Sequence, residues 1–471
     1  LFSATQAATT THDAATAYAS LTFAPVVTQL ALGYHNTCGL TNTGGMKCWG
    51  NNSWGQIGSS ASGTQTSPSN LPGYTSNVSA IAGGHHHTCA ITTAGAVRCF
   101  GYNWNNNLSP SISSGAVDIS AGYLHTCALM SYGGVKCWGR NDSAGQLGDG
   151  TNTNRVAAVD VVGLTSGVTA ITTGHEFSCA LLSPGAVKCW GYNGWGQIGS
   201  AASAVQTTPV NVPGYTSGIA AISEAHHSTC ALTTTGAVRC WGWGGYGGLG
   251  SGISSGVTAI TSGYAHSCAL MAYGGVKCWG YNGYGQLGDG TNSDRGEATD
   301  VVGLSSGVVA IDAGYMHTCA LLNTGAMKCW GSNDQQQLGD GATGRKNVPT
   351  QVTGLTSGVT SISSGLYHTC AVLATGAAKC WGANDYGQLG DASNSYRSVP
   401  TDVSTLSANV ASISAGWEHT CARLTTGAAK CWGRNNEGEL GDGTNTSRNV
   451  PVNVVGLSSG VTSIETGQSL F

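Results

Sequence analysis

The chain has 471 residues, a formal net charge of −4, 73 glycines and only 8% charged residues. Because no basic or acidic block interrupts it, the composition argues against a nucleic-acid partner. Five phenylalanines and five methionines are too few for one large conventional core, which favours many small packed layers. No stretch approaches the ~20 apolar residues of a membrane-spanning helix.

Residues 1–25 are rich in alanine and threonine and lack the pattern that follows. We expect either a flexible tail or an arm that docks on a neighbouring molecule. The first residue is Leu1, with no signal-peptide pattern after it, so we expect a processed or trimmed form.

A repeating unit begins at Val26 and fills residues 26–471. Its clearest copy opens with Val257-Thr-Ala-Ile-Thr-Ser-Gly263, an alternating, β-branched segment that predicts a strand. A β-hairpin is predicted next, with arms at 266–270 and 276–279 around a glycine-rich turn. A glycine-rich loop and a further strand-like piece, 299–304, complete a unit of about four short strands.

Two cysteines ten positions apart occur in every unit, and together the pairs use all 18 cysteines. Counting inward along the hairpin, Cys268 falls opposite Cys278, so the two side chains share one face and can form a disulfide. Cysteines used only in pairs favour an oxidising compartment. The predicted disulfides are Cys38–Cys48, Cys89–Cys99, Cys127–Cys137, Cys179–Cys189, Cys230–Cys240, Cys268–Cys278, Cys319–Cys329, Cys370–Cys380 and Cys421–Cys431.

The nine units carry a second, longer period. Successive first cysteines lie 51 or 52 residues apart, except that 38 residues precede the third and the sixth. Units one to three recur as units four to six, and units seven to nine form a third, more uniform triplet. Residues 460–467 open a tenth unit, which can close a ring onto the first unit or pair with another molecule by strand addition.

The repeat resembles the RCC1 (regulator of chromosome condensation) family. The matching signature is Gly-x-x-His-Ser/Thr-Cys-Ala-Leu, then Gly-x-Val-Lys-Cys-Trp-Gly-x-Asn-x-x-Gly-Gln-Leu-Gly-Asp-Gly-Thr, and residues 263–304 carry nearly all of it. The resemblance implies an all-β propeller with one four-stranded, disulfide-stapled blade per unit. We expect nine blades in one ring, with seven as the fallback. The cysteine-paired form is similar to secreted bacterial members.

Histidines and aspartates recur at fixed positions of the unit. For His87, His125, His266, His317, His368 and His419 we weigh a repeated metal site against a structural hydrogen bond, and favour the bond because Asn36, Phe177 and Ser228 replace histidine elsewhere. For Asp149, Asp289, Asp340, Asp391 and Asp442 we weigh calcium against tight turns, and favour turns paired with Arg155, Arg295, Arg397 and Arg448.

Basic and aromatic residues form two further repeated sets. The basic set precedes the second cysteine and shares a strand face with Trp or Phe, so we expect stems packed on aromatic rings; an anion-binding ring lining the channel is the alternative. It comprises Lys47, Arg98, Lys136, Lys188, Arg239, Lys277, Lys328, Lys379 and Lys430. Loop aromatics five positions after the Trp are candidates for a binding rim, against packing between blades: Trp54, Trp195, Tyr246, Tyr284 and Tyr386.

No catalytic arrangement stands out from the repeat, so we expect neither enzyme activity nor a cofactor. The sequence predicts an extracellular or cell-surface propeller that binds a protein or glycan through rim loops. The alternative is a structural subunit of an extracellular filament or surface layer, in which copies assemble through their terminal strands.

Overall fold

A computed structural model describes residues 27–32, 36–58, 63–102, 111–199, 204–225, 228–242, 253–461 and 464. It contains nine separate antiparallel sheets, in each of which neighbouring strands follow one another in the sequence. We number these sheets blades 1 to 9 in chain order. The predicted arm, residues 1–25, lies outside the described residues.

Each blade is a meander that runs outward from the centre of the ring. The inner strands are β1 (Val27–Leu32), β5 (Val78–Gly83), β8 (Ala116–Ala121), β12 (Val168–Thr173), β16 (Ile219–Ala225), β19 (Val257–Ser262), β23 (Val308–Ala313), β27 (Val359–Ser364) and β31 (Val410–Ala415). The second strands are β2 (Asn36–Thr41), β6 (His87–Thr92), β9 (His125–Met130), β13 (Phe177–Leu182), β17 (Ser228–Thr233), β20 (His266–Met271), β24 (His317–Leu322), β28 (His368–Leu373) and β32 (His419–Leu424).

The third and fourth strands lie farther from the centre. The third strands are β3 (Met46–Asn51), β7 (Val97–Gly101), β10 (Val135–Gly139), β14 (Ala186–Tyr192), β18 (Val238–Gly242), β21 (Val276–Gly280), β25 (Met327–Gly331), β29 (Ala378–Gly382) and β33 (Ala429–Gly433). The fourth strands are β4 (Thr64–Asn70), β11 (Arg155–Asp160), β15 (Val205–Asn211), β22 (Arg295–Asp300), β26 (Lys346–Gln351), β30 (Arg397–Asp402) and β34 (Arg448–Asn453).

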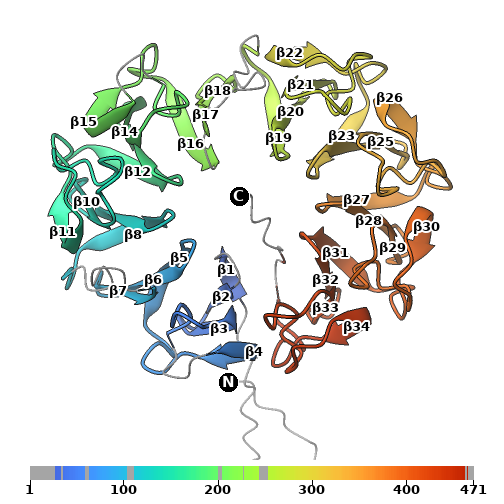
Figure 1. The fold of residues 1–471 in the computed structure, drawn as a ribbon, viewed down its shortest axis with the longest axis horizontal. Helices are drawn as coiled ribbons and strands as arrows, with labels where there is room; N and C mark the ends of the chain where they lie inside the picture. The colour runs from blue at the N-terminus through green and yellow to red at the C-terminus, as the bar shows by residue number, and fades with distance from the viewer. Residues whose placement is uncertain are drawn as a thin grey trace, which may run out of the picture.

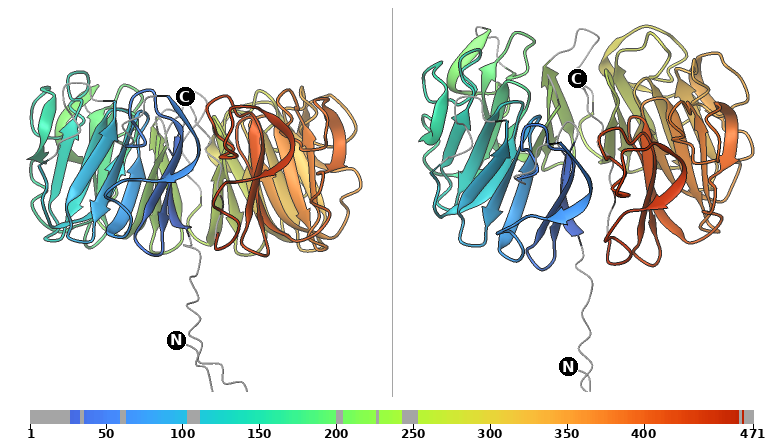
Figure 2. Two further views of the ribbon diagram at one scale, coloured as in Figure 1. Left: turned by 90° about the horizontal axis from the view of Figure 1, so that it is seen from below. Right: turned by 60° about the horizontal axis from the view of Figure 1, so that its bottom comes forward.

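The blades stand side by side in one flat ring around a central opening (Figures 1 and 2). The predicted nine-bladed propeller is therefore confirmed, and the seven-bladed fallback is wrong. One detail differs, because blades 2 and 5 have three strands within the described residues and the other seven have four. These two compact blades are the short units that precede the third and sixth cysteine pairs.

The disulfides join the cysteines that were predicted to face each other across each hairpin. In the β20–β21 register Cys268 faces Cys278, and the same pairing recurs in each hairpin, including Cys230 opposite Cys240. Eight disulfides are seen in full, each with a sequence separation of 10 residues, and no described cysteine is free. Each bond joins the second and third strands of one blade, so it staples a hairpin and never links two blades.

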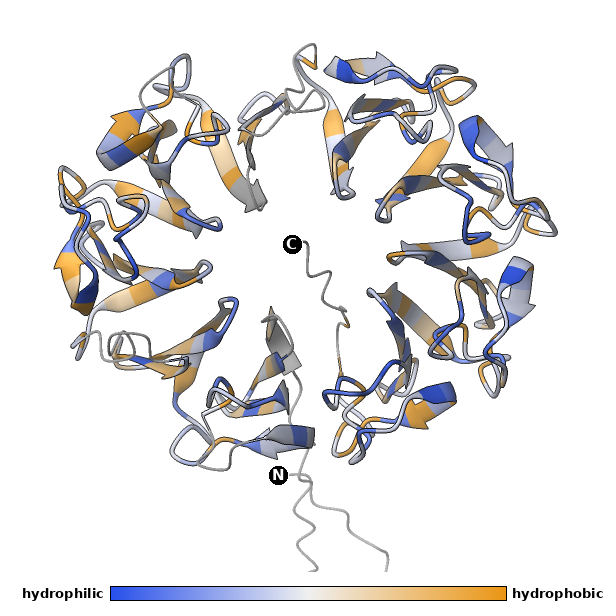
Figure 3. Cartoon of the chain, in the orientation of Figure 1, coloured by the Kyte–Doolittle hydropathy of each residue, from blue (hydrophilic) through white to orange (hydrophobic). Residues whose placement is uncertain are grey.

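The apolar core is divided into clusters that lie between neighbouring blades. In one of them Val410, Ile413 and Trp432 of blade 9 pack against Cys370 and Leu389 of blade 8. The first and fourth residues of an inner strand insert into the preceding blade in the other clusters too. Figure 3 shows the orange, hydrophobic residues along the inner strands, such as β8 and β12. Packing between blades therefore supplies the hydrophobic stabilisation that single meanders lack.

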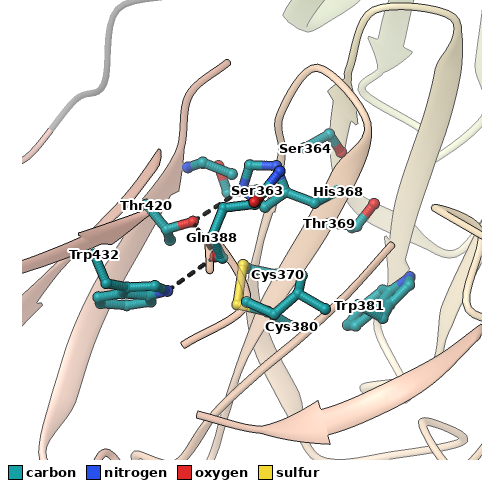
Figure 4. The surroundings of a disulfide bond; sticks show 12 residues. Ser363, Ser364, His368, Thr369, Cys370, Cys380, Trp381, Gln388, Thr420 and Trp432 are labelled. Carbon is teal, nitrogen blue, oxygen red and sulfur yellow. Dashed lines mark hydrogen bonds between the residues drawn. A yellow bond between two sulfur atoms is a disulfide. The ribbon is translucent and has the colours of Figure 1, made fainter. Parts of the chain in front are cut away.

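A repeated set of hydrogen bonds joins blade 3 to blade 4 and links blades 6 to 9 in series. Between blades 8 and 9, the indole Nε1–H of Trp432 donates to the backbone carbonyl of Gln388 at 2.9 Å, and the Thr420 hydroxyl donates to the same carbonyl at 2.8 Å (Figure 4). His368 Nε2 lies 2.8 Å from the Thr420 hydroxyl. The set recurs between blades 6 and 7 and between blades 7 and 8. We call it the interblade clasp.

The structural interpretation of the histidines is thus confirmed. Five of the six rings that were weighed as metal ligands bond a Thr or Ser hydroxyl of the next blade: His87, His125, His266, His317 and His368. Asn36 replaces the histidine in blade 1 and donates to Thr88 in the same way. The described residues hold no group of three or more His, Cys, Asp or Glu side chains placed for a metal ion.

Blades 9 and 1 are joined by hydrogen bonds between their loops and strands, and residues of the tenth unit pack beside this boundary. The Gly443 N–H donates to the Thr66 carbonyl at 2.8 Å, and Asn51 Nδ2 donates to Glu437 Oε2 at 2.8 Å. From the predicted tenth unit, Val461 and Ile464 pack against the core of blade 9. They correspond in the repeat to Val410 and Ile413, which pack on blade 8. The start of the tenth unit therefore packs on blade 9 as the inner strand of the following blade packs on each of blades 1 to 8.

Acid should unfold this ring through its buried histidines. Burial lowers the pKa of His368 and His317 to about 3 and of His266 to about 4, against about 6.5 when unfolded. The folded state then binds fewer protons than the unfolded chain between pH 6.5 and 4, so stability is present above pH 6.5 and is lost as pH falls through that window. Asp312 acts in the opposite direction, because burial raises its pKa to about 7 and stability falls as pH rises to that value.

We therefore expect His368→Asn to reduce the acid sensitivity. Asparagine makes the clasp bond at the equivalent position of blade 1, and it does not titrate. The substitution therefore removes a contribution of up to about 1.4 kcal/mol per pH unit to the pH dependence of the free energy of unfolding. Urea unfolding midpoints from pH 4.5 to 7 should fall less steeply for the variant than for the natural chain. Parallel losses of stability in the two proteins would contradict the assignment.

The clasp tryptophans should be the least replaceable side chains of the ring. Trp381 is fully buried, and truncation to alanine removes its packing and its bond to the Gln337 carbonyl. We expect Trp381→Ala to cost about 3–5 kcal/mol. Trp381→Phe is the matched control, because Phe100 holds this position in blade 2, and it should cost clearly less in the same unfolding measurement.

Candidate binding face

Five long blades carry a loop after the third strand that is held by the hydrogen bonds of one aspartate. In the loop of blade 6, Asp289 Oδ1 accepts hydrogen bonds from the Thr291 N–H and hydroxyl and from Asn282 Nδ2, while Oδ2 pairs with Arg295 at 2.7 Å. Burial acts to raise the pKa of Asp289, but the bonds from Thr291 and Arg295 outweigh it, and the pKa lies below its ordinary value. The carboxylate is saturated by protein donors, as a turn-building role requires.

The predicted aspartate–arginine pairs are confirmed. Arg155, Arg397 and Arg448 bind Asp149, Asp391 and Asp442 at 2.6 to 2.8 Å. A fifth pair was not predicted: Lys346 takes the place of arginine and lies 3.4 Å from Asp340.

Three of the basic residues before the second cysteine make a contact that was not predicted. Lys136, Lys277 and Lys379 form ion pairs of 2.6 to 2.7 Å with an aspartate at the end of the fourth strand: Asp160, Asp300 and Asp402. Because these residues lie on third strands and the inner strands surround the opening (Figure 1), the proposed channel lining is wrong. No described contact shows the lysine stems on aromatic rings.

The loop aromatics sit on preorganised backbone. The N–H of Trp54, Trp195, Tyr284 and Tyr386 each donates to the side-chain oxygen of the glutamine two residues later, at 2.9 to 3.0 Å. Trp54 is 53% exposed and Trp195 49% exposed. Tyr246 lies outside the described residues.

Three of these aromatics also contact the next blade. The Arg345 guanidinium of blade 7 lies 4.1 Å from the Tyr284 ring centroid, and that of Arg434 in blade 9 lies 5.7 Å from Tyr386. Trp54 meets Tyr102 of blade 2 edge to face at 4.7 Å. Packing between blades thus holds for Tyr284, Tyr386 and Trp54, although about half of the surface of Trp54 and of Trp195 stays exposed.

A second set of aromatics, which the sequence analysis missed, lies in the Gly-x-x-His turns between inner and second strands. Tyr123 stacks on His175 at 4.2 Å and meets His85 at 4.6 Å. On the other side of the ring, Tyr315 lies 4.6 Å from Tyr264 and 5.7 Å from Tyr367. The signal was available in the two variable positions of the turn, which hold His, Tyr or Trp in most units.

Both sets belong to the same end of the ring. The turn before each second strand lies beside the end of the third strand, as the bond from Tyr281 N–H to the Ala265 carbonyl shows. Tyr102 contacts both Trp54 and His86, so it joins the loop set to the turn set over blades 1 and 2. Burial raises the pKa of Tyr315, and neighbouring tyrosines including Tyr284 add to the effect. We call these residues together the aromatic face.

Three arginines of this face are neutralised by carboxylates within it. Arg140 contacts Asp142 and Glu176, and Arg434 contacts Glu418 and Glu439. Arg345 lies 3.5 Å from Asp334. Aromatic surface with paired charges suits a partner recognised by apolar contact and hydrogen bonds more than by net charge.

Sequence comparisons match this repeat to two models of one family. Both models describe the regulator of chromosome condensation (RCC1) repeat. One matches residues 44–91, 273–321, 325–372, 379–423 and 430–470, and the other matches residues 27–56, 116–146, 257–286, 308–337, 359–388 and 410–439. Together these segments cover more than half of the chain.

Curated relatives and solved structures resemble parts of the chain. The ultraviolet-B receptor UVR8 of Arabidopsis thaliana is 30% identical over 321 residues, 67% of this chain and 64% of the receptor. The human E3 ubiquitin-protein ligase HERC2 is 30% identical over 409 residues, 81% of this chain and 8% of the ligase. The chain thus spans less than two thirds of either relative.

Among solved structures, yeast RCC1 (Prp20) bound to Kap60 is 18% identical. The match covers 95% of this chain and 91% of that chain, with a TM-score of 0.49. Human WBSCR16 is 18% identical over a match that covers 87% of this chain and 94% of that chain, with a TM-score of 0.48. The described residues contain no helix long and apolar enough to cross a bilayer. The repeat matches, the nine meanders and the signature residues together establish that this chain belongs to the RCC1 repeat family.

Proposed function

We propose that this chain is a secreted or cell-surface propeller of the bacterial, cysteine-paired type that binds a protein or glycan partner without catalysing a reaction. The aromatic face carries the proposal. Rigid, half-exposed indoles such as Trp54 and Trp195 are costly to leave in water unless a partner covers them, and aromatic residues dominate binding surfaces. The locked loop backbone lowers the ordering cost that a partner must offset.

Two further observations support the proposal. The disulfide in nearly every described hairpin favours an oxidising, extracellular setting. Relatives with the same repeat engage proteins, since one solved structure is of yeast Prp20 bound to Kap60 and another report concerns Prp20 binding to Gsp1p and histones.

A structural subunit of an extracellular filament or surface layer is the second candidate. The packing of Val461 and Ile464 on blade 9 favours it, because the same packing by the terminal strand of a second copy would join two molecules. Electron microscopy of the purified chain separates the candidates, since discrete rings support the binding module and fibres or sheets support assembly through the terminal strands.

Paired alanine variants test the aromatic face. We expect Trp54→Ala with Trp195→Ala to abolish capture of partners from extracellular protein extracts and glycan arrays, because both half-exposed indoles are lost. The matched control is Tyr132→Ala with Tyr273→Ala. These tyrosines are 54% and 58% exposed but lie in hairpin turns at the opposite end of the ring.

Both double variants should stay folded, with a small loss of stability in the tryptophan variant because Trp54 gives up its edge contact with Tyr102. Capture that survives in the tryptophan variant, or that is lost in the tyrosine variant, would contradict the proposed face.

A further inference from the structure

Neighbouring inner strands are joined near their ends by a side chain. The fifth residue of one inner strand accepts a hydrogen bond from the N–H of the sixth residue of the next inner strand. The Thr261 hydroxyl accepts from the Ala313 N–H at 3.0 Å, and the Ser363 hydroxyl accepts from the Ala415 N–H at 2.9 Å. Because an inner strand is the edge of its sheet, this side chain covers an N–H on the open side of that sheet.

One of these joining residues is a carboxylate. Asp312 holds the fifth position of β23, and its Oδ2 accepts the N–H of Ser364 on β27. The fifth position of the other inner strands is serine, threonine or alanine, none of which carries a charge. Figure 1 shows β23 and β27 side by side at the central opening. The junction of blades 7 and 8 therefore contains a group that can gain and lose a proton.

No cation compensates Asp312 within the part of the chain that the structure describes. Its pKa is raised by burial, against hydrogen bonds from Ser364, Ala313 and Thr261, and no charged group contributes to the shift. The inner strands β19, β23, β27 and β31 hold no other charged residue.

The titratable groups on the second strands and turns around Asp312 are histidines and tyrosines. Burial lowers the pKa of these histidines to about 3 or 4, so they are neutral at pH 7. Phenol groups are neutral there too. The groups are His266, His317, His368, Tyr264, Tyr315 and Tyr367. An ionised Asp312 would therefore be a lone charge among neutral neighbours.

The bond between Asp312 and Ser364 lies at the base of two turns of the aromatic face. Ser364 is the last residue of β27, and Asp312 is the last but one of β23. The turns that follow these strands carry Tyr315 and Tyr367, whose rings meet edge to face at 5.7 Å. A change at this bond is therefore transmitted directly to both tyrosines.

The neighbouring turns on either side have an additional backbone link. The Tyr264 N–H donates to the Tyr315 carbonyl at 3.1 Å, and the Leu366 N–H donates to the Gly416 carbonyl at 3.2 Å. Among the described backbone bonds, none joins the turns of blades 7 and 8. Asp312 therefore supplies the link at the base of these two turns.

We propose that Asp312 regulates the aromatic face by joining the turns of blades 7 and 8 when it is protonated and releasing them when it is ionised. This regulation rests on the proposed function, because it matters only if a partner uses this part of the face. A neutral carboxyl group is satisfied by the hydroxyl and N–H groups around it. A buried carboxylate without a counter-ion favours an open junction that admits water.

Opening of the junction should depend on pH. The pKa of Asp312 is about 7 in the closed junction, against 3.8 for an ordinary carboxyl group, which an open junction would expose to water. Opening therefore becomes easier as pH rises from about 4 to 7, by up to about tenfold per pH unit, and levels off above pH 7. The buried histidines act in the opposite direction below pH 6.5, so a variant of Asp312 is needed to isolate its contribution.

Hydrogen exchange of the Ser364 amide, followed by mass spectrometry from pH 5 to 8, tests the proposal without a partner. We expect the exchange rate of the natural chain divided by that of Asp312→Asn to rise by up to about tenfold per pH unit and to level off near pH 7. Intrinsic exchange and the histidines are common to both proteins, so they cancel in this ratio. The Ala415 amide is the internal control, because Ser363 holds it, and its ratio should stay constant.

Asp312→Ser is a second variant, since Ser363 makes the same bond with a hydroxyl, and it should behave as Asp312→Asn does. A ratio at Ser364 that does not change with pH overturns the proposal. An equal change at Ala415 also overturns it, because the whole ring would then loosen rather than one junction. Neither outcome affects the proposed function, which is measured separately by capture of partners with the tryptophan variant.

Discussion

At four blade interfaces one backbone carbonyl joins the two blades, those of Gln146, Gln286, Gln337 and Gln388. The carbonyl of Gln286 accepts both the Trp330 indole and the Thr318 hydroxyl of the next blade. The side chain of the same glutamine accepts the N–H of Tyr284, which fixes the loop that carries this aromatic residue. Packing between blades and the geometry of the aromatic face therefore depend on a single buried residue, and a partner that binds the loops acts on the blade interface as well.

The compact blades show how the clasp is replaced when its loop is missing. Trp138 and Trp279 follow compact blades and pack with Ile112 and Ile253 instead of against a loop glycine. On the other side of each compact blade a tyrosine supplies cover: Tyr74 meets Phe100, and Tyr215 stacks on Trp241. These contacts bury the cores beside the compact blades. Within the described residues, no contact replaces the bond from the loop to the outer strand of the following blade.

Much of this architecture could be predicted from the sequence because it is local. The cysteine register, the Asp289–Arg295 pair and the count of nine units all follow from spacings within one unit. The ion pair of Lys277 with Asp300 was missed because strand alternation relates residues of one strand and says nothing of its neighbour. The contact of Tyr123 with His175 joins two blades, and the variable residue types of the turns hide it from a search for repeats. Tyr123 and His175 meet because their turns lie side by side on neighbouring blades, and their residue types alone do not indicate that contact.

The disulfides have a mechanical consequence. Every staple lies inside a blade, so no covalent bond other than the main chain resists the separation of one blade from the next. A molecule pulled by its two ends would come apart one interface at a time, beginning where a blade has lost a neighbour. Each released blade would lengthen by less than its full contour, because the residues between its two cysteines stay looped. Such a ring would yield in steps and keep a looped remnant in every repeat whose disulfide is intact.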